Sequence, residues 1–297
     1  MLAKRAPRLR GPYIDTAEGE GEMAKLDGKI ALVSGAGRGI GQAIATKLAE
    51  EGARLVINDL DIEPAEETCR VVRRAGSEAL PVIGSVTDPA FGDRFVQAAL
   101  DEYGRIDIIV NNAGYTWDSV VQKMTDEQWY AMIDVHLTAP FRILRAAAPY
   151  LRDAAKAELA SGDRVTRKVV NISSIAGLGG NAGQSGYASG KAGIIGLTKT
   201  LAKEWGRYNV TVNSLAFGVI KTRLTEAVAG GDSTISIEDR EIKVGINAQL
   251  MAAMEGGIAL GRAGTPRDAA NGVYLLCLPE SDYITGEVLV CSGGMAL

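Results

Sequence analysis

Short apolar runs alternate along the chain with longer stretches whose apolar residues recur at helical spacing. Strands are expected at residues 29–35, 54–59, 79–84, 106–112, 168–173, 210–216 and 286–294. Helices are expected near residues 40–51, 64–75, 89–103, 126–152, 186–206 and 267–278. Runs such as "IDIIVNN" are apolar at successive positions, as strands buried on both faces require. The alternation predicts an α/β fold in which a doubly wound, seven-stranded parallel sheet is flanked by helices.

The same pattern sets the expected limits of the domain. Residues 1–22 begin basic and turn acidic, and they lack the apolar core of a secretory signal. We therefore expect a flexible N-terminal extension followed by a single domain over residues 23–297, with Met23 as a candidate alternative start. A charged insert at 152–168 and the stretch 220–266 are expected to be irregular.

Composition narrows the class of partner. The formal net charge is −4, so the sequence offers no basic surface for nucleic acid or an anionic membrane. No apolar run reaches the roughly 18 residues that span a bilayer. Three widely spaced cysteines and a single histidine form neither a disulfide framework nor a nitrogen–sulfur metal site. We expect a cytoplasmic protein with a small-molecule partner and no bound metal.

The turn "SGAGRGIG" follows the first expected strand and opens the first expected helix. Gly35, Gly39 and Gly41 stand where a chain turns tightly and approaches a pyrophosphate, which the free amides of a helix N-terminus attract. Asp59 ends the second strand and can accept hydrogen bonds from a ribose 2′-hydroxyl, which favours NAD over NADP. Arg38 in the turn favours NADP instead. The sequence predicts a Rossmann-type domain that binds NAD or, less readily, NADP.

Tyr187 and Lys191 lie four residues apart in an expected helix and therefore on one face of it. A nearby ammonium stabilises a phenolate, so Lys191 is expected to lower the pKa of Tyr187 and let it shuttle a proton. Spacing alone favours the simpler interpretation of a surface tyrosine beside a solvated lysine. His136, the only histidine, is of the residue type most often used for acid–base chemistry at neutral pH.

The motifs "SGAGRGIG", "NNAG", "NISSIAG" and "YASGK" occur in this order. In this combination the chain resembles the short-chain dehydrogenase/reductase family over about residues 24–297, and more narrowly its 3-oxoacyl-[acyl-carrier-protein] reductase branch. The resemblance implies that Tyr187 is the general acid/base and that Ser174 hydrogen-bonds the substrate oxygen. It also implies that Lys191 supports Tyr187 and holds the nicotinamide ribose.

Three positions depart from the family pattern. His136 takes the place of an asparagine that supports a water linking the lysine to solvent. A neutral imidazole both donates and accepts a hydrogen bond, so either a relay or a merely packed histidine fits this position. Ser85 replaces an aspartate that contacts adenine, and Phe217 replaces a proline beside the nicotinamide.

The resemblance extends the expected site. Further cofactor-binding residues that it implies are Ile40, Leu60, Ser85, Val86, Asn112, Ala113, Gly114, Gly218, Ile220 and Thr222. The substrate wall is expected to include Tyr115, Trp117 and Gln184, although Trp117 fits ordinary packing equally well. A homotetramer built partly from the helices at 126–152 and 186–206 is also implied.

These residues predict reversible hydride transfer between nicotinamide C4 and a carbonyl or secondary alcohol, with a 3-oxoacyl thioester as candidate substrate. A cofactor-binding protein of the same fold with impaired catalysis is the alternative, and His136, Ser85 and Phe217 motivate it. A nucleotide-sugar epimerase is disfavoured, because the chain returns to a last strand and ends seven residues after Val290.

Overall fold

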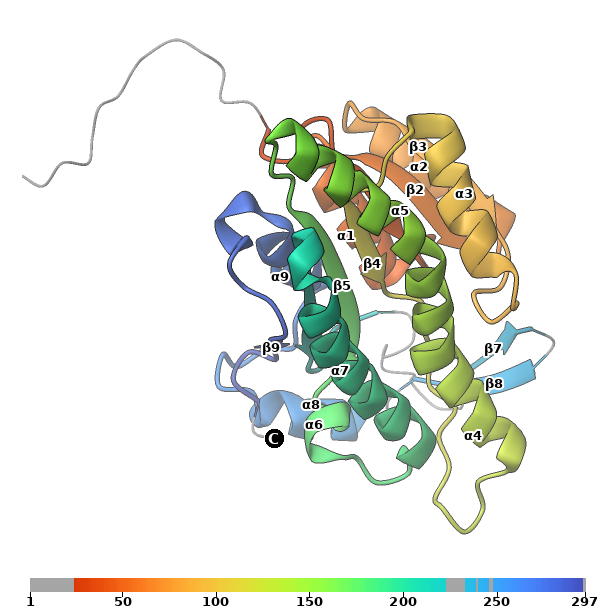
Figure 1. The fold of residues 1–297 in the computed structure, drawn as a ribbon. Coiled ribbons are helices and arrows are strands. Elements are labelled where there is room, and N and C mark those ends of the chain that lie inside the picture. Colours follow the sequence, from red (N-terminus) through yellow and green to blue (C-terminus); the bar gives the residue numbers. More distant parts are fainter. Residues whose placement is uncertain (1–23, 223–232, 239, 246–247, 296–297) are drawn as a thin grey trace, which may run out of the picture.

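The computed structural model describes residues 24–222, 233–238, 240–245 and 248–295. Its centre is a seven-stranded sheet of parallel strands in the order β3-β2-β1-β4-β5-β6-β9 (Figure 1). The strands are β1 (Ile30–Val33), β2 (Arg54–Asp59), β3 (Ala79–Ile83), β4 (Ile108–Asn111), β5 (Arg167–Ser174), β6 (Val210–Phe217) and β9 (Val288–Cys291), and β7 (Ser233–Ile237) and β8 (Arg240–Val244) form a separate antiparallel hairpin. The strand order reverses between β1 and β4. The predicted doubly wound, seven-stranded sheet is confirmed.

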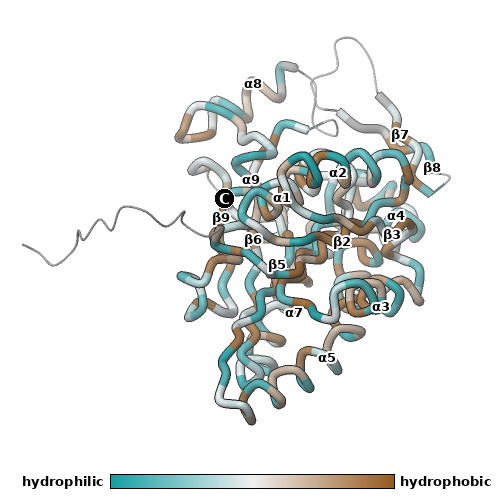
Figure 2. The backbone as a smooth tube through the Cα atoms, turned by 90° about the horizontal axis from the view of Figure 1, so that it is seen from above, coloured by the Kyte–Doolittle hydropathy of each residue, from teal (hydrophilic) through white to brown (hydrophobic). Residues whose placement is uncertain are grey.

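Two layers of helices enclose the sheet (Figures 1 and 2). The helices are α1 (Gly39–Glu50), α2 (Ile62–Arg74), α3 (Phe91–Tyr103), α4 (Asp126–Ile133), α5 (Ala139–Ser161), α6 (Ala176–Gly179), α7 (Ser185–Trp205), α8 (Ala248–Gly256) and α9 (Pro266–Cys277). One apolar cluster joins the sheet to α1, α2 and α9, and a second joins it to α3, α5 and α7. Each predicted helix therefore has a counterpart.

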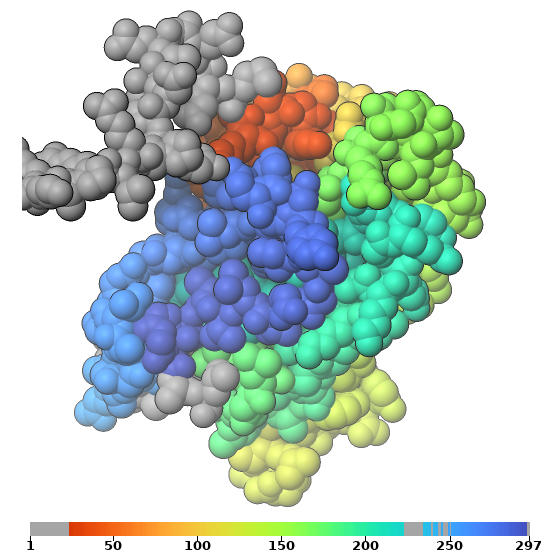
Figure 3. All heavy atoms as spheres, turned by 60° about the vertical axis from the view of Figure 1, so that its left-hand side comes forward, coloured from red at the N-terminus to blue at the C-terminus, as the bar shows by residue number. Residues whose placement is uncertain are grey.

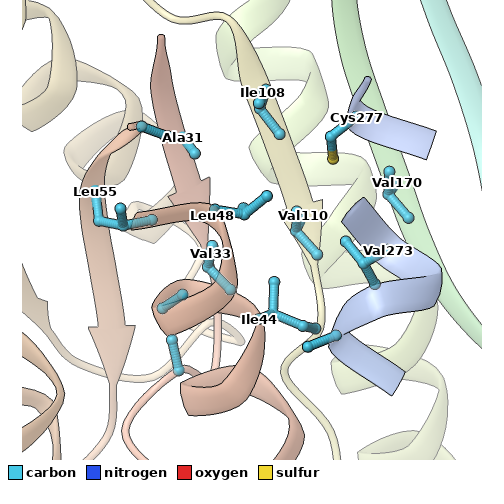
Figure 4. Close-up of a cluster of buried hydrophobic side chains, with 14 of the residues drawn as sticks. Ala31, Val33, Ile44, Leu48, Leu55, Ile108, Val110, Val170, Val273 and Cys277 are labelled. Carbon is cyan, nitrogen blue, oxygen red and sulfur yellow. The ribbon is translucent and has the colours of Figure 1, made fainter. Parts of the chain in front are cut away.

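Alternate residues of the central strands point into different helix layers. Val33 of β1 packs in the same cluster as Ile44 and Leu48 of α1 (Figure 4), whereas Ile30 and Leu32 belong to the cluster on the opposite face. All five side chains are fully buried. Burial of a large aliphatic side chain contributes about 1.5–3 kcal/mol. Packing on both faces explains why these strands appear in the sequence as continuous apolar runs.

The helix expected at 126–152 is interrupted. α4 begins at a capping box in which the Gln128 N–H donates to the Thr125 hydroxyl at 3.2 Å and the Thr125 N–H donates to the Gln128 side chain at 2.9 Å. Asp134–Thr138 then form a π-helical turn before α5 begins. Single π turns inside helices are frequent at functional sites. This one contains His136.

The charged insert at 152–168 was expected to be irregular. The structure shows that it is mostly helical. α5 continues through Pro149 and ends before Gly162, whose φ of +87° is a left-handed conformation that stops a helix. Arg167 opens β5 with a buried guanidinium that donates to the Glu158 carboxylate at 2.8 Å. The insert therefore lengthens α5, and an ion pair ties the end of the helix to the sheet.

The hairpin of β7 and β8 lies within the stretch 220–266 that was expected to be irregular, so this expectation is wrong for the hairpin and for α8. Both views place the hairpin beside α4 and the end of β3 (Figures 1 and 2). Residues 223–232, 239 and 246–247 lie outside the described residues. The same holds for the predicted N-terminal extension, 1–22.

Three observations concern the described part of the chain as a whole. No helix in it combines the length and apolar character needed to cross a bilayer. No group of three or more His, Cys, Asp or Glu side chains in it is placed to hold a metal ion. Cys69, Cys277 and Cys291 are free thiols, and the first two are buried.

Candidate active site

The carboxyl ends of the parallel strands open into one cleft of about 1070 Å³. Ligands of doubly wound sheets bind at this edge, where the strand order reverses. The residues singled out from the sequence that line the cleft are Gly35, Arg38, Gly39, Ile40, Gly41, Asp59, Leu60, Ser85, Val86, Asn112, Ala113, Gly114, Tyr115, His136, Ser174, Gln184, Tyr187, Lys191, Phe217, Gly218, Ile220 and Thr222. Trp117 does not line it but packs against the core, with the Arg240 guanidinium 5.7 Å from its ring.

The glycine turn after β1 is fixed by contacts with the residue that follows β4. Gly35 and Gly39 have φ of +60° and +56°, the left-handed region that favours glycine. A Cβ at Gly41 would lie 2.1 Å from the carbonyl oxygen of Gly35, so only glycine lets α1 pack this close to the turn. The Asn112 side chain donates to the carbonyl oxygens of Ser34 and Gly35 at 3.0 and 2.9 Å. The path of the turn is therefore determined by its neighbours.

The N-terminus of α1 fits a phosphate group. The helix has no side-chain cap, and Gly39, Ile40 and Gly41 of its first turn line the cleft. A Cβ at Gly39 would meet nothing closer than Thr222 at 3.8 Å, so the space in front of the turn is open. Uncapped amides at a helix N-terminus attract anions. These residues thus fit the pyrophosphate of a dinucleotide.

Asp59, at the end of β2, borders the same part of the cleft. Its carboxylate accepts hydrogen bonds from the N–H groups of Gly37 and Asp61 at 2.9 and 3.2 Å. The Arg38 guanidinium donates to the Asp61 carboxylate at 2.8 Å. Arg38, which was expected to favour NADP, is therefore paired with Asp61, while the Asp59 carboxylate is held beside the turn.

Ser174, Tyr187 and Lys191 come together at the other end of the cleft. Ser174 ends β5, and its hydroxyl lies close enough to Tyr187 of α7 to influence the pKa of the phenol. The Lys191 ammonium donates to the carbonyl oxygen of Ile172 at 2.8 Å and lies 5.7 Å from the centre of the Tyr187 ring. Only 4% of Lys191 is exposed, so the interpretation of a solvated surface lysine is wrong.

Burial dominates the acid–base properties of this pair. It raises the pKa of Tyr187 to about 12, opposed by the nearby hydroxyl of Ser174 and reinforced by the negative charge of Asp118. Burial lowers the pKa of Lys191 to about 7. The expected lowering of the Tyr187 pKa by Lys191 is not found, because desolvation of the phenolate outweighs the other effects. Tyr187 is a protonated phenol at neutral pH.

His136 lies against Tyr187. The two rings meet edge-on with centroids 4.9 Å apart, and Nε2 of His136 donates to the carbonyl oxygen of Tyr115 at 2.7 Å. Because a carbonyl only accepts, Nε2 carries the proton and Nδ1 is an acceptor. Nδ1 is buried and has no hydrogen-bond partner among the described residues. Gly114 and Gly190 make room for the His136 side chain. A Cβ at Gly114 would lie 2.3 Å from Cε1 of His136, and a Cβ at Gly190 would lie 3.0 Å from its Cβ.

In the folded protein, His136 is expected to stay neutral at pH values well below the ordinary pKa of a histidine. Burial and the positive charge of Lys191 hold the pKa of His136 well below 6.5, opposed by the hydrogen bond to the Tyr115 carbonyl. The unfolded chain takes up this proton near pH 6.5 and the folded chain only at lower pH, so His136 makes folding less favourable as the pH falls below about 6.5. NMR measures this directly, because one histidine gives one set of ring signals. A midpoint near pH 6.5 in the folded protein contradicts it.

Three acids that line the cleft were not found from the sequence: Asp61, which pairs with Arg38, Asp118 and Glu238. Asp118 accepts a hydrogen bond from the Gln184 side chain at 2.8 Å, and the N–H of Ser119 donates to the Gly183 carbonyl at 2.8 Å, so the loop after β4 is joined to the start of α7. Burial raises the pKa of Asp118, opposed by Gln184. Glu238 follows β7 in the hairpin. The only sequence signal for this hairpin is the alternation of polar and apolar residues in "STISI".

Comparison with known proteins identifies the family. A profile of the short chain dehydrogenase family matches residues 29–232. The chain is 37% identical over 270 residues to the 3-oxoacyl-[acyl-carrier-protein] reductase FabG of Vibrio cholerae and 38% identical over 270 residues to that of Escherichia coli, each covering 91% of this chain and 98% of the relative. A crystal structure from Sinorhizobium meliloti 1021, provisionally assigned as a short-chain alcohol dehydrogenase, matches with a TM-score of 0.79 and 29% identity, covering 92% of this chain and 98% of that one.

The chain belongs to the short-chain dehydrogenase family. It is an NAD(P)-dependent oxidoreductase of the branch to which the 3-oxoacyl-[acyl-carrier-protein] reductases belong, which confirms the predicted resemblance. Nothing in these comparisons favours the alternative of impaired catalysis. The presence of Ser174, Tyr187 and Lys191 at one end of the cleft also argues against that alternative.

Proposed function

We propose that this protein reduces the 3-oxo group of an acyl thioester, or oxidises the corresponding secondary alcohol, with a nicotinamide dinucleotide bound in the cleft. The observation that carries the proposal is the meeting of Ser174, Tyr187 and Lys191 at one end of a cleft whose other end holds the glycine turn. The names of the relatives from Vibrio cholerae and Escherichia coli support a 3-oxoacyl thioester as the substrate class.

Two hydroxyl groups are proposed to polarise the substrate oxygen. Ser174 and Tyr187 lie near each other and line the cleft, so both can donate to one carbonyl oxygen between them. A bound nicotinamide supplies the hydride in reduction and accepts it in oxidation. With a pKa of about 12, Tyr187 keeps its proton at neutral pH and is suited to give it to the developing alkoxide. Donors already fixed in a buried site need little reorganisation during the reaction.

Lys191 and His136 are proposed to return the proton to Tyr187. A lysine with a pKa of about 7 exchanges its proton readily near neutral pH. The unpaired Nδ1 of His136 is a buried acceptor, and such atoms are usually satisfied by ordered water. A water bound there would link Lys191 to the Tyr115 side of the cleft. In this proposal His136 serves the relay through Nδ1, and its Nε2 bond fixes the ring.

NAD is the proposed preferred cofactor. Asp59 can accept a hydrogen bond from a ribose hydroxyl and repels a 2′-phosphate, while Arg38 is paired with Asp61.

Replacing Asp59 with alanine is expected to shift the ratio of kcat/KM values at least about tenfold toward NADPH, equivalent to about 1.4 kcal/mol. Asp101→Ala, which removes an acid on α3 outside the cleft, is the control and should keep the parent ratio. A parent enzyme that already prefers NADPH contradicts the assignment.

We also propose the homotetramer that the family resemblance implies. Large exposed apolar side chains lie on α4 and α5, namely Trp129, Tyr130 and Phe141, and near the edge strand β9, namely Tyr283, Ile284, Leu289 and Val290. Figure 3 shows the C-terminal segment, in blue, at the surface beside α7, in teal. Exposed apolar surface is a common mark of association surfaces, and these side chains support the proposal. Light scattering at several concentrations measures the mass, and a monomer at all of them contradicts the proposal.

The activity is proposed to reside in a single domain over residues 23–297 that works in the cytoplasm. The glycine turn follows β1 and Ser174 ends β5, two strands of one continuous sheet, which supports a single unit. The free thiols of Cys69, Cys277 and Cys291 support a reducing compartment.

An absorbance assay with a short 3-oxoacyl thioester tests the proposed reaction, using NADH and NADPH separately. We expect one equivalent of cofactor to be oxidised for each 3-hydroxyacyl thioester formed. If the cofactor is oxidised only with other ketones, the proposed thioester substrate is wrong but the proposed hydride transfer stands. No oxidation with either cofactor across a panel of ketones contradicts the reaction itself.

A further inference from the structure

The β7–β8 hairpin is anchored to the rim of the cleft beside the end of β3. Residue exposure alternates along it: Ile242 is fully buried, Ile235 and Ile237 are partly buried, and Glu241 is exposed. The three isoleucines pack in the cluster that contains Val86, which follows β3. Apolar burial therefore holds one face of the hairpin against the domain.

The turn of the hairpin places a carboxylate against the loop that follows β3. Glu238 has a φ of +51°, which non-glycine residues seldom adopt. Its Oε1 accepts hydrogen bonds from the hydroxyl of Ser85 and, at 3.2 Å, from that of Thr87. Its Oε2 accepts from the Arg240 guanidinium at 3.1 Å, and Arg240 also donates to Glu127 of α4 at 3.0 Å. Glu238 is thus held in place from both sides.

This corner of the cleft is where the adenine end of a dinucleotide belongs. The triad of Ser174, Tyr187 and Lys191 lies at β5 and α7, the glycine turn follows β1, and Asp59 ends β2. A dinucleotide with its nicotinamide at the triad, its pyrophosphate at the turn and its ribose at Asp59 continues in the same direction toward β3. Glu238 lines the cleft at that end.

We propose that Glu238 binds the adenine base by accepting a hydrogen bond from its exocyclic amino group, so that the hairpin supplies one wall of the cofactor site. A carboxylate has about four acceptor positions, and donors from Ser85, Thr87 and Arg240 contact it among the described residues. Carboxylates pair with exocyclic amines of bases because they only accept. The inference rests on dinucleotide binding in this cleft and adds a residue that selects the base.

Two reduced cofactors that differ only in the base test this assignment. In nicotinamide hypoxanthine dinucleotide a carbonyl oxygen replaces the adenine amino group. Fluorescence titration of the whole protein gives the dissociation constants of reduced NAD and of the reduced analogue, or of the NADP pair if that binds more tightly. The parent is expected to bind the adenine form about tenfold more tightly, since a hydrogen bond to a charged group is lost with the analogue. In Glu238→Gln, whose amide can donate to the carbonyl, the ratio should fall to about one or reverse.

Glu241→Gln is the matched control, because it removes the same charge from the exposed face of the same hairpin. It should keep the parent ratio. Equal binding of the two cofactors by the parent overturns the assignment, as does an unchanged ratio in Glu238→Gln or the same loss in Glu241→Gln. If the parent binds neither NADH nor NADPH, the proposed function fails and this inference fails with it.

Discussion

Replacement of Tyr187 with phenylalanine is expected to lower turnover by about 10²- to 10⁴-fold while cofactor affinity changes little. The substitution removes the proton donor and one of the two hydroxyls that polarise the substrate oxygen. The ring remains and keeps its edge-on contact with His136. Loss of this one hydroxyl should change the free energy of unfolding by no more than about 0.5–1.5 kcal/mol. Steady-state kinetics, cofactor titration and thermal unfolding of the same preparation measure the three quantities.

Tyr208→Phe is the matched control for this variant. Tyr208 lies in the short 3-10 turn after α7, with the Arg207 guanidinium 4.9 Å from its ring, and does not line the cleft. Its replacement should leave turnover unchanged. A Tyr187→Phe enzyme that turns over within a few-fold of the parent would remove Tyr187 from the reaction.

Alanine at Gly41 is expected to weaken cofactor binding strongly and to destabilise the fold. Its Cβ would lie 2.1 Å from the carbonyl oxygen of Gly35 and 2.5 Å from the side-chain nitrogen of Asn112. These two atoms form the 2.9 Å hydrogen bond that ties the glycine turn to the residue after β4, so the turn has to move. Overpacking of this kind costs about 1–3 kcal/mol. A displaced turn also no longer presents the amides of α1 to the pyrophosphate.

Gly206→Ala controls for the change from glycine to alanine. Gly206 has a φ of −52°, in the helical region, and a Cβ there would meet nothing within 4 Å. This substitution should alter the free energy of unfolding by less than about 1 kcal/mol, in the stabilising direction, by restricting the unfolded chain. Urea unfolding and cofactor titration compare the two variants. Parent-like stability and affinity in Gly41→Ala would show that the close packing of the turn is not required.

The core of the fold was predictable because burial on both faces leaves a local signal. Ile30, Leu32 and Val33 are apolar in succession since neighbouring positions of β1 enter different helix layers. The end of α5 was not predictable in this way. Its last turns are charged on the solvent side, and the residues that fix them, Glu158 and the buried Arg167, interact across the boundary between helix and strand.

The candidate site also contains features that have a local sequence signal and features that depend on long-range contacts. The order of the motifs points to Ser174, Tyr187 and Lys191, but the direction of the Tyr187 pKa shift depends on desolvation by the whole surrounding structure. Glu238 has no local signal, because its contact with Ser85 joins residues 153 positions apart. Only the folded chain brings such a pair together.

The transfer of deuterium from reduced nicotinamide to substrate tests the central claim most directly. NADH or NADPH labelled at C4, on each face in turn, is incubated with a short 3-oxoacyl thioester, and the product is analysed by mass spectrometry. We predict that one of the two labelled forms places a single deuterium on the carbinol carbon of the 3-hydroxyacyl product, and that Tyr187→Phe yields almost none in the same time. Product that carries no deuterium from either form would contradict hydride transfer in this cleft.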